Sequence, residues 1–206
     1  ILIRLGIWAK LIQINEMSIS IGNHIVKYPI FLAPMAGITD LPFRNVVSHF
    51  KTGHFVSEMI ASQELLSGRP GTVQKASLGV DTEKTSIQIS GRDPYIISET
   101  AKLVEGLGAK IIDINMGCPA KKVVNGYAGS ALLRDLGLAA KLIEAVVSSV
   151  SVPVTLKTRL GWNDDDLNAP CLARIAEQVG IKLITIHART RCQFYKGAAQ
   201  WRLVRR

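Results

Sequence analysis

One cysteine, Cys118, stands in a setting that suits acid chemistry. It follows Gly117 and precedes Pro119, directly after an apolar run that we expect to be a strand. A thiol with an ordinary pKa of about 8.5 keeps its proton at neutral pH and can still donate it to a substrate. Taken alone, such a residue is more often a small buried side chain that packs as a hydrophobe. The surrounding sequence must therefore decide between these two interpretations.

Polar or functional side chains also stand at or near the ends of other predicted strands. Lys157 offers an ammonium group, and Gln88 offers both a hydrogen-bond donor and an acceptor. The residues at these ends are Met35, Glu58, Gln88, Asn115, Lys157 and His187. A lone histidine at a strand end is usually a hydrogen-bonded structural residue, and the four histidines show no metal-binding spacing. No metal site is predicted.

Six short β-branched runs position these residues, and helical segments separate them. The runs cover residues 30–34, 54–58, 85–90, 110–115, 153–157 and 182–187. This rhythm predicts an α/β fold with a parallel sheet. A doubly wound sheet is disfavoured because the first run leads into Pro34-Met35-Ala36-Gly37 and not into a glycine-rich phosphate loop. We predict a (β/α)8 TIM-barrel type of fold, incomplete in this chain, with about six βα units and the polar residues at its carboxyl-terminal mouth.

Helix boundaries support this interpretation. Asp93 and Pro94 predict the start of a helix that Gly108 closes. Residues 129–150 are expected to form one further long helix. The acidic run 164–166 is interpreted as a helix N-terminal cap and not as a metal site.

The composition indicates a globular protein with a polyanionic partner. Hydrophobic residues make up 48% of the 206 residues, and 25 Lys and Arg against 16 Asp and Glu give a net charge of +9. That balance favours nucleic acid as a partner without proving it. The three cysteines form no CxxC pair, which favours a reducing cytoplasm. No membrane segment is predicted, because charged residues interrupt the apolar N-terminal stretch.

We divide the chain into an N-terminal extension, residues 1–16, and a partial barrel domain, residues 17–206. The extension is either a loosely attached leader or an ordinary first element packed on the barrel. Six strands leave the first and last edges unpaired, which predicts self-association and weak cofactor binding by residues 1–206 alone.

Several motifs together resemble the tRNA-dihydrouridine synthases, most closely the bacterial B-type. They are residues 33–40 (APMAGITD), 57–59 (SEM), 113–123 (DINMGCPAKKV), 129–134 (GSALLR) and 186–191 (IHARTR). The segment around Cys118 is the most specific of them. The resemblance extends from about residue 30 to the end of the chain.

The resemblance implies a flavin enzyme that reduces particular uridines of tRNA to 5,6-dihydrouridine with NAD(P)H. Cys118 would be the catalytic acid that protonates the uracil ring. The resemblance implies that FMN contacts Pro34, Met35, Ala36, Gln88, Lys157 and His187. For substrate binding we predict Asn115, Lys121, Arg159 and Arg189. Basic and aromatic residues around the mouth would suit an exposed base and its phosphates.

Two other functions remain open. A flavin barrel that reduces a free pyrimidine or a similar small molecule would share the cofactor residues but would need no basic rim. An inactive fragment of a split or decaying synthase gene would keep the motifs without closing the barrel. No protein partner is inferred.

Overall fold

The computed structural model describes residues 18–50, 53–79 and 81–204. Its elements, in chain order, are β1 (Ser18–Ile21), β2 (His24–Lys27), β3 (Phe31–Leu32), α2 (Leu41–Ser48), β4 (His54–Val56), β5 (Ile60–Ala61), α3 (Ser62–Leu66), α4 (Pro70–Lys75), η1 (Thr82–Lys84), β6 (Thr85–Ser90), α5 (Pro94–Gly106), β7 (Ile112–Met116), α6 (Lys121–Asn125), η2 (Gly129–Arg134), α7 (Leu136–Val147), β8 (Val154–Arg159), α8 (Ala169–Val179), β9 (Leu183–His187) and α9 (Trp201–Val204).

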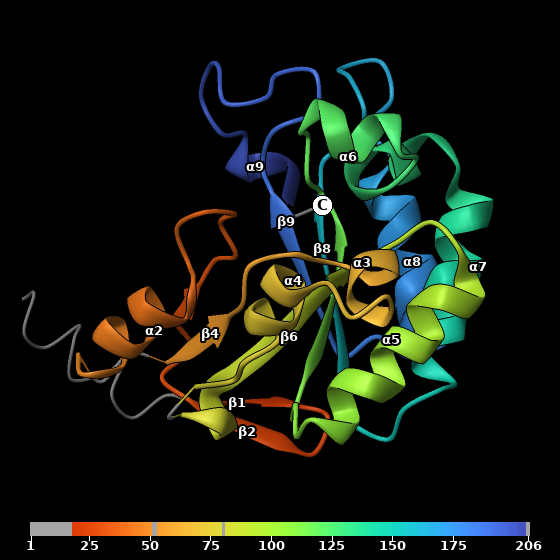
Figure 1. Ribbon diagram of the computed structural model, residues 1–206. Coiled ribbons are helices and arrows are strands. Elements are labelled where there is room, and N and C mark those ends of the chain that lie inside the picture. The colour runs from red at the N-terminus through yellow and green to blue at the C-terminus, as the bar shows by residue number, and fades with distance from the viewer. Residues whose placement is uncertain (1–17, 51–52, 80, 205–206) are drawn as a thin grey trace, which may run out of the picture.

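A parallel sheet organises the molecule. Its strands run in the order β3-β4-β6-β7-β8-β9, and β5 pairs with the carboxyl end of β6. Consecutive strands are neighbours, as in a barrel, and helices α5, α7 and α8 cover one face of the sheet (Figure 1). The predicted α/β fold of TIM-barrel type, incomplete in this chain, is confirmed. Among the described residues, β3 and β9 form the unpaired edges of the sheet.

The main hydrophobic core lies between the sheet and these outer helices. Alternate residues of the central strands point outward into it, including Ile87, Ile89, Ile114 and Leu156, and all four are at most 1% exposed. The side chains between them in sequence therefore point to the other face of the sheet. That inner face carries the polar residues described below.

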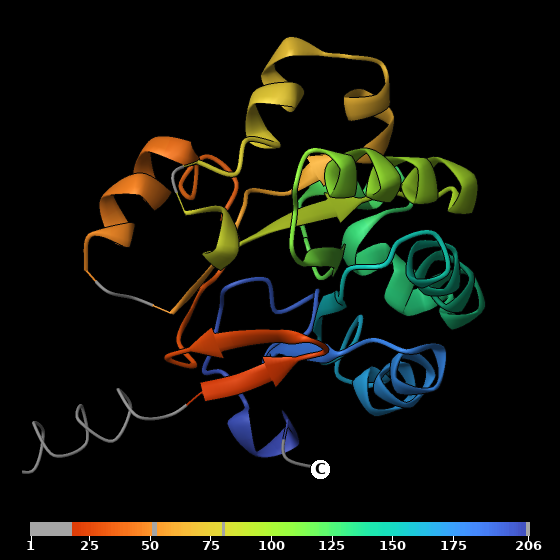
Figure 2. The same cartoon turned by 90° about the horizontal axis from the view of Figure 1, so that it is seen from below.

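An antiparallel hairpin of β1 and β2 closes the amino-terminal end of the sheet (Figure 2). Ile21 and Val26 pack there against Ile111 in a second, smaller core. The turn needs Gly22, which has a φ of +61°, and a Cβ at this position would lie 2.9 Å from Pro153. The sequence prediction missed this hairpin and the two-residue strand β5.

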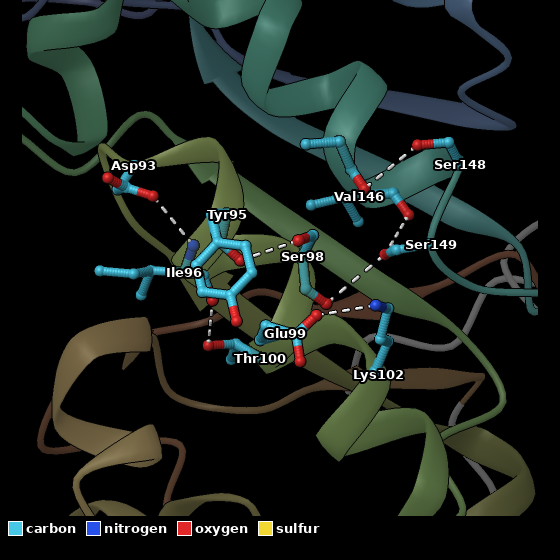
Figure 3. Close-up of polar contacts among 11 residues, drawn as sticks. Asp93, Tyr95, Ile96, Ser98, Glu99, Thr100, Lys102, Val146, Ser148 and Ser149 are labelled. Atoms are coloured by element: carbon cyan, nitrogen blue, oxygen red, sulfur yellow. Dashed lines mark hydrogen bonds and ion pairs between the residues drawn. The ribbon is translucent and has the colours of Figure 1, made fainter.

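Helix α5 begins and ends where its sequence predicts. The Asp93 carboxylate accepts a hydrogen bond from the Ile96 amide at 3.0 Å, as Figure 3 shows, and Pro94 occupies the first turn. Beyond the helix, Gly108 has a φ of +98°. The Ser149 hydroxyl donates to the Ser98 carbonyl at 3.5 Å and so connects the end of α7 to α5.

Two predictions about helices were wrong. Residues 129–150 do not form one helix: η2 comes first, and α7 begins only after Asp135, whose carboxylate caps it through the Leu138 amide at 2.9 Å. The two helices are separated at Asp135, whose backbone is not helical (φ −144°, ψ 83°). Gly129, at the start of η2, has a φ of +60° and lies against the Cys118 carbonyl too closely for a Cβ. The acidic run 164–166 does not cap α8, whose N-cap position is Asn168.

None of the helices in the described ranges is long and apolar enough to cross a membrane. The N-terminal extension, residues 1–16, lies outside the described residues.

His54 generates a prediction about pH and stability. It is 1% exposed, its Nε2 lies 2.5 Å from the Ser86 hydroxyl, and burial, with a smaller contribution from nearby His24, lowers its pKa from 6.5 to about 4. Between pH 6.5 and about 4 the unfolded chain therefore takes up a proton that the folded chain excludes. Stability from this group is complete above pH 6.5 and is lost as the pH falls toward 4.

Between pH 6.5 and about 4, acidification should lower the free energy of unfolding by roughly 3 kcal/mol less in His54→Gln than in the unsubstituted chain. Thermal melts between pH 4 and 8, compared with the exposed His49→Gln as a control, measure the difference. Parallel pH profiles for the two variants would contradict this assignment.

Candidate functional site at the mouth of the partial barrel

The carboxyl ends of β7, β8 and β9 bring the predicted residues together on the inner face of the sheet. Asn115 pairs in register with Lys157, and Arg159 pairs with His187 one layer further toward the mouth. Gln88 lies one layer deeper, in register with Asp113. Cys118 follows β7 on the loop to α6 and is partly exposed. These residues form the wall and the rim of one mouth, as predicted.

A continuous hydrogen-bonded network crosses three strands beneath this mouth. The Thr155 hydroxyl donates to one oxygen of Asp113 at 2.5 Å, and the Gln88 side-chain amide donates to the other at 2.7 Å. The Gln88 carbonyl oxygen accepts from the Asn115 amide at 2.9 Å. The Asn115 carbonyl oxygen then accepts from the backbone amides of Gly117 at 3.2 Å and Cys118 at 3.0 Å. The network thus runs from the sheet interior to the backbone of Cys118.

Asp113 is the anchor of this network, and the sequence prediction assigned it no role. Its side chain is buried, and burial raises its pKa, while the hydrogen bonds from Gln88 and Thr155 and the charge of Lys157 act in the opposite direction. Its position two residues before Asn115 places both side chains on one strand face, and that spacing is the signal that identifies it.

Lys157 brings a positive charge next to this network. No ion pair or side-chain hydrogen bond joins its ammonium group to another residue of the described chain. Burial lowers its pKa, while the nearby charge of Asp113 raises it. A partly buried, unpaired ammonium is costly, and an anionic partner at the mouth would stabilise it.

Arg159 links the loops of the mouth. It is 2% exposed, and its guanidinium donates to the carbonyl oxygens of Gly117 at 2.9 Å, Thr190 at 3.0 Å and Phe194 at 2.8 Å. It therefore connects the Cys118 loop to the segment after β9. Its predicted contact with substrate stays a prediction, and the structure shows these backbone contacts instead.

His187 and Arg189 lie together at the rim beyond β9. Arg189 donates to the Gly197 carbonyl at 2.8 Å and approaches the His187 ring nitrogen at 3.2 Å. Burial, followed by the charges of Arg159, Lys157 and Arg189, lowers the pKa of His187 to about 4. The imidazole is therefore neutral near pH 7, with Nε2 accepting from Arg189 and the Nδ1–H left as a donor.

The segment with Pro34, Met35 and Ala36 follows β3 on the other side of the mouth. It is held in place by Glu58, whose carboxylate accepts from the Gly37 amide at 2.6 Å and lies 3.9 Å from the ammonium of Lys75. Met35 is 38% exposed, so its thioether is accessible to a ligand. Sequence reasoning did not assign this supporting role to Glu58.

Lys121 and an arginine-tryptophan cluster complete the basic rim. Lys121 is exposed at the start of α6. The guanidiniums of Arg134 and Arg191 each lie 4.9 Å from the centre of the Trp162 ring. Such cation–π contacts hold two positive charges close together at the surface.

The donor set suits the ring of an organic cofactor such as a flavin. An unpaired ammonium, a neutral imidazole and an accessible thioether match a flat heteroaromatic ring with a polar edge. Within residues 18–50, 53–79 and 81–204, no group of three or more His, Cys, Asp or Glu residues could hold a metal ion.

Comparisons with known proteins identify the family of the chain. The family model "Dihydrouridine synthase (Dus)" matches residues 31–206. The chain is 53% identical over 188 residues to a probable tRNA-dihydrouridine synthase of Rickettsia bellii, covering 91% of this chain and 58% of the relative. It is 46% identical to tRNA-dihydrouridine synthase B of Pseudomonas aeruginosa, covering 90% of this chain and 56% of the relative. The chain thus spans rather more than half the length of these relatives.

Histamine dehydrogenase from Rhizobium sp. 4-9 is similar in structure, with a TM-score of 0.63 at 14% identity, covering 93% of this chain and 40% of that one. This likeness concerns the fold alone. The family resemblance read from the motifs is confirmed by the sequence matches. The chain belongs to the dihydrouridine synthase family.

Proposed function

We propose that this chain forms the catalytic part of an FMN-dependent tRNA-dihydrouridine synthase, with Cys118 as the proton donor. One observation carries the proposal. The Asn115 side chain accepts a hydrogen bond from the Cys118 amide and donates one to Gln88, so it joins the proposed acid to a proposed flavin-binding residue. In the overall reaction, NAD(P)H, a proton and a uridine give NAD(P)⁺ and a 5,6-dihydrouridine. Bound FMN would pass the hydride from the nicotinamide to C6 of the uracil.

Cys118 supplies the other hydrogen. Its Sγ–H bond breaks as a C5–H bond forms, and the thiolate regains its proton from solvent. Proton transfer of this kind needs the thiol at a fixed distance from the ring. Side-chain contacts at Cys118 itself help to hold its loop: the Asn115 carbonyl oxygen accepts from the Cys118 amide, and the Cys118 carbonyl accepts from the Ser130 hydroxyl at 2.9 Å.

Lys157 and Gln88 are proposed to hold the polar edge of the flavin ring. The ammonium of Lys157 stabilises negative charge at that edge, and its unpaired state leaves it available. Gln88 is fully buried, with one amide hydrogen donated to Asp113 and its carbonyl oxygen accepting from Asn115, and its second amide hydrogen is the group proposed to contact the flavin. Pro34, Met35, Ala36 and His187 would complete the cofactor site.

The RNA would lie over the exposed cations of the rim. Lys121 is free to reach a phosphate, whereas Arg189 is partly engaged by Gly197. Asn115 uses most of its side chain on the Cys118 loop, so its contact with the uracil would depend on its second amide hydrogen. A tRNA substrate would place the enzyme in the cytoplasm.

The first prediction concerns Cys118 in a chimaera in which residues 1–206 replace the matching part of the Pseudomonas aeruginosa relative. Cys118→Ala should leave flavin reduction by NADPH intact and slow its reoxidation by tRNA about 10²-fold or more, the scale of a lost general acid. Stopped-flow absorbance measures both steps. The exposed Cys192→Ala is the control, and an unchanged reoxidation rate in Cys118→Ala would remove this thiol from the mechanism.

The second prediction concerns Lys157 in the same chimaera. Lys157→Met should make the midpoint potential of the bound flavin more negative and slow its reduction, because the positive charge at the ring edge is lost. Spectroelectrochemical titration measures the potential, with the exposed Lys182→Met as control. Equal potentials in the two variants would show that Lys157 does not touch the flavin.

The third prediction concerns Asp113 and uses residues 1–206 without cofactor. Asp113→Asn keeps one oxygen for the Gln88 amide but turns the other into a donor, so the Thr155 hydroxyl must accept instead of donate and two charge-assisted hydrogen bonds are lost, which costs about 1–3 kcal/mol. The loosened loop should also make Cys118 react faster with iodoacetamide. Thermal melts and mass spectrometry of alkylation at Cys118 measure the two effects.

The exposed Asp164→Asn is the matched control and should change neither quantity. An Asp113→Asn chain that melts earlier but alkylates Cys118 at the original rate would show that Asp113 stabilises the sheet without positioning the thiol.

A further inference from the structure

A pocket of about 430 Å³ lies beside the mouth, at the carboxyl ends of β5 and β6. Its walls come from α3 and α4, from the start of α5, and from α6 with the segment that follows it, which lies above α3 in Figure 1. Its volume falls within the range of sites that bind small ligands. None of the residues assigned above to flavin or substrate lines it, so it is a separate feature, which we call the α3–α6 pocket.

The charge left unpaired in this pocket is positive. Three basic side chains line it: Lys75, Arg92 and Lys122. Both lining carboxylates are engaged: Glu64 accepts from Arg69 at 2.8 Å, and Asp93 caps α5. Among the described residues, neither Arg92 nor Lys122 has an ion-pair partner. The pocket is therefore suited to an anion.

The rest of the lining favours a ligand larger than a simple anion. Met59, Ile96, Val123 and Ala128 provide an apolar surface, as in pockets that bury the ring of a small ligand. Ser90 also lines the pocket, is 5% exposed, and its hydroxyl has no hydrogen-bond partner. A nucleotide would use all three features of the pocket. Its base and sugar would lie on the apolar surface, its phosphate would contact the cations, and a polar group of the base or sugar would pair with the Ser90 hydroxyl.

The pocket shares a wall with the Cys118 loop. Val123 and Ala128 line it, and they belong to the segment that returns from α6 to contact the Cys118 carbonyl through the Ser130 amide at 3.0 Å. One side of this segment faces the pocket, and the other supports the thiol. A ligand in the pocket would therefore lie next to the proposed target base.

We propose that the α3–α6 pocket binds a nucleotide of the RNA substrate that neighbours the target uridine, with its phosphate on Arg92 and Lys122. The assignment rests on the proposed function. It gives the RNA a second contact, on the opposite side of the Cys118 loop from the rim residue Arg189.

Filter binding of tRNA to the chimaera described above, with and without substitutions in this chain, tests the assignment. The double variant Arg92→Gln/Lys122→Gln should bind at least about 10-fold more weakly than the unsubstituted chain and should lose about one unit from the slope of log affinity against log salt. Lys141→Gln/Lys182→Gln is the control: it removes the same charge at exposed positions on α7 and at the start of β9. It should bind nearly as well as the unsubstituted chain.

A second measurement locates the contact. Bound tRNA, and uridine 5′-monophosphate at high concentration, should protect Lys122 from acetylation but leave Lys141 reactive, as read by mass spectrometry.

Equal losses of affinity in the two double variants, or equal protection of the two lysines, would overturn the assignment and leave the proposed function standing. Protection of Lys122 by NADPH but not by tRNA would assign the pocket to the reductant. An unsubstituted chain that binds no tRNA would contradict the proposed function together with this inference.

Discussion

The structure depends on one constraint: the buried polar side chains of Asp113, Gln88 and Asn115, together with Thr155 on β8, must pair with one another on the inner face of the sheet. Asp113 has a hydrogen bond at each oxygen, and Gln88 and Asn115 are oriented by the order of donors that Asp113 imposes. Each buried polar group left without a partner would cost about 1–3 kcal/mol. The same set of hydrogen bonds therefore fixes the register of three strands and the position of the Cys118 backbone.

This constraint explains how the Cys118 loop is held while the thiol itself makes no hydrogen bond in the described residues. Its loop is attached to the sheet through Asn115 and Arg159, and to the segment before α7 through Ser130 and the close contact at Gly129. Each attachment ends on backbone and leaves the thiol free. The same segment forms a wall of the α3–α6 pocket, so a ligand in that pocket would contact the segment that holds the Cys118 backbone.

Much of the fold was predictable because parallel strands leave a local signal. The six apolar runs correspond to β3, β4, β6, β7, β8 and β9, and the cap at Asp93 marks α5. The division of 129–150 was not predictable from periodicity, since apolar residues continue on both sides of Asp135, where the backbone leaves the helical conformation. The site residues reach the mouth as predicted, but the buried links of Arg159 and Asp113 depend on partners far along the chain.

The fate of hydrogen at C5 of the uracil tests the central claim most directly. The chimaera reacts with tRNA in D₂O, and proton NMR of the isolated dihydrouridine locates the deuterium. If Cys118, held by Asn115, is the acid, C5 gains a solvent deuterium on a single face of the ring in the unsubstituted chimaera. The Cys118→Ala variant then forms dihydrouridine slowly, with deuterium on both faces. A Cys118→Ala variant that makes the same single-face product at an unchanged rate would contradict the account.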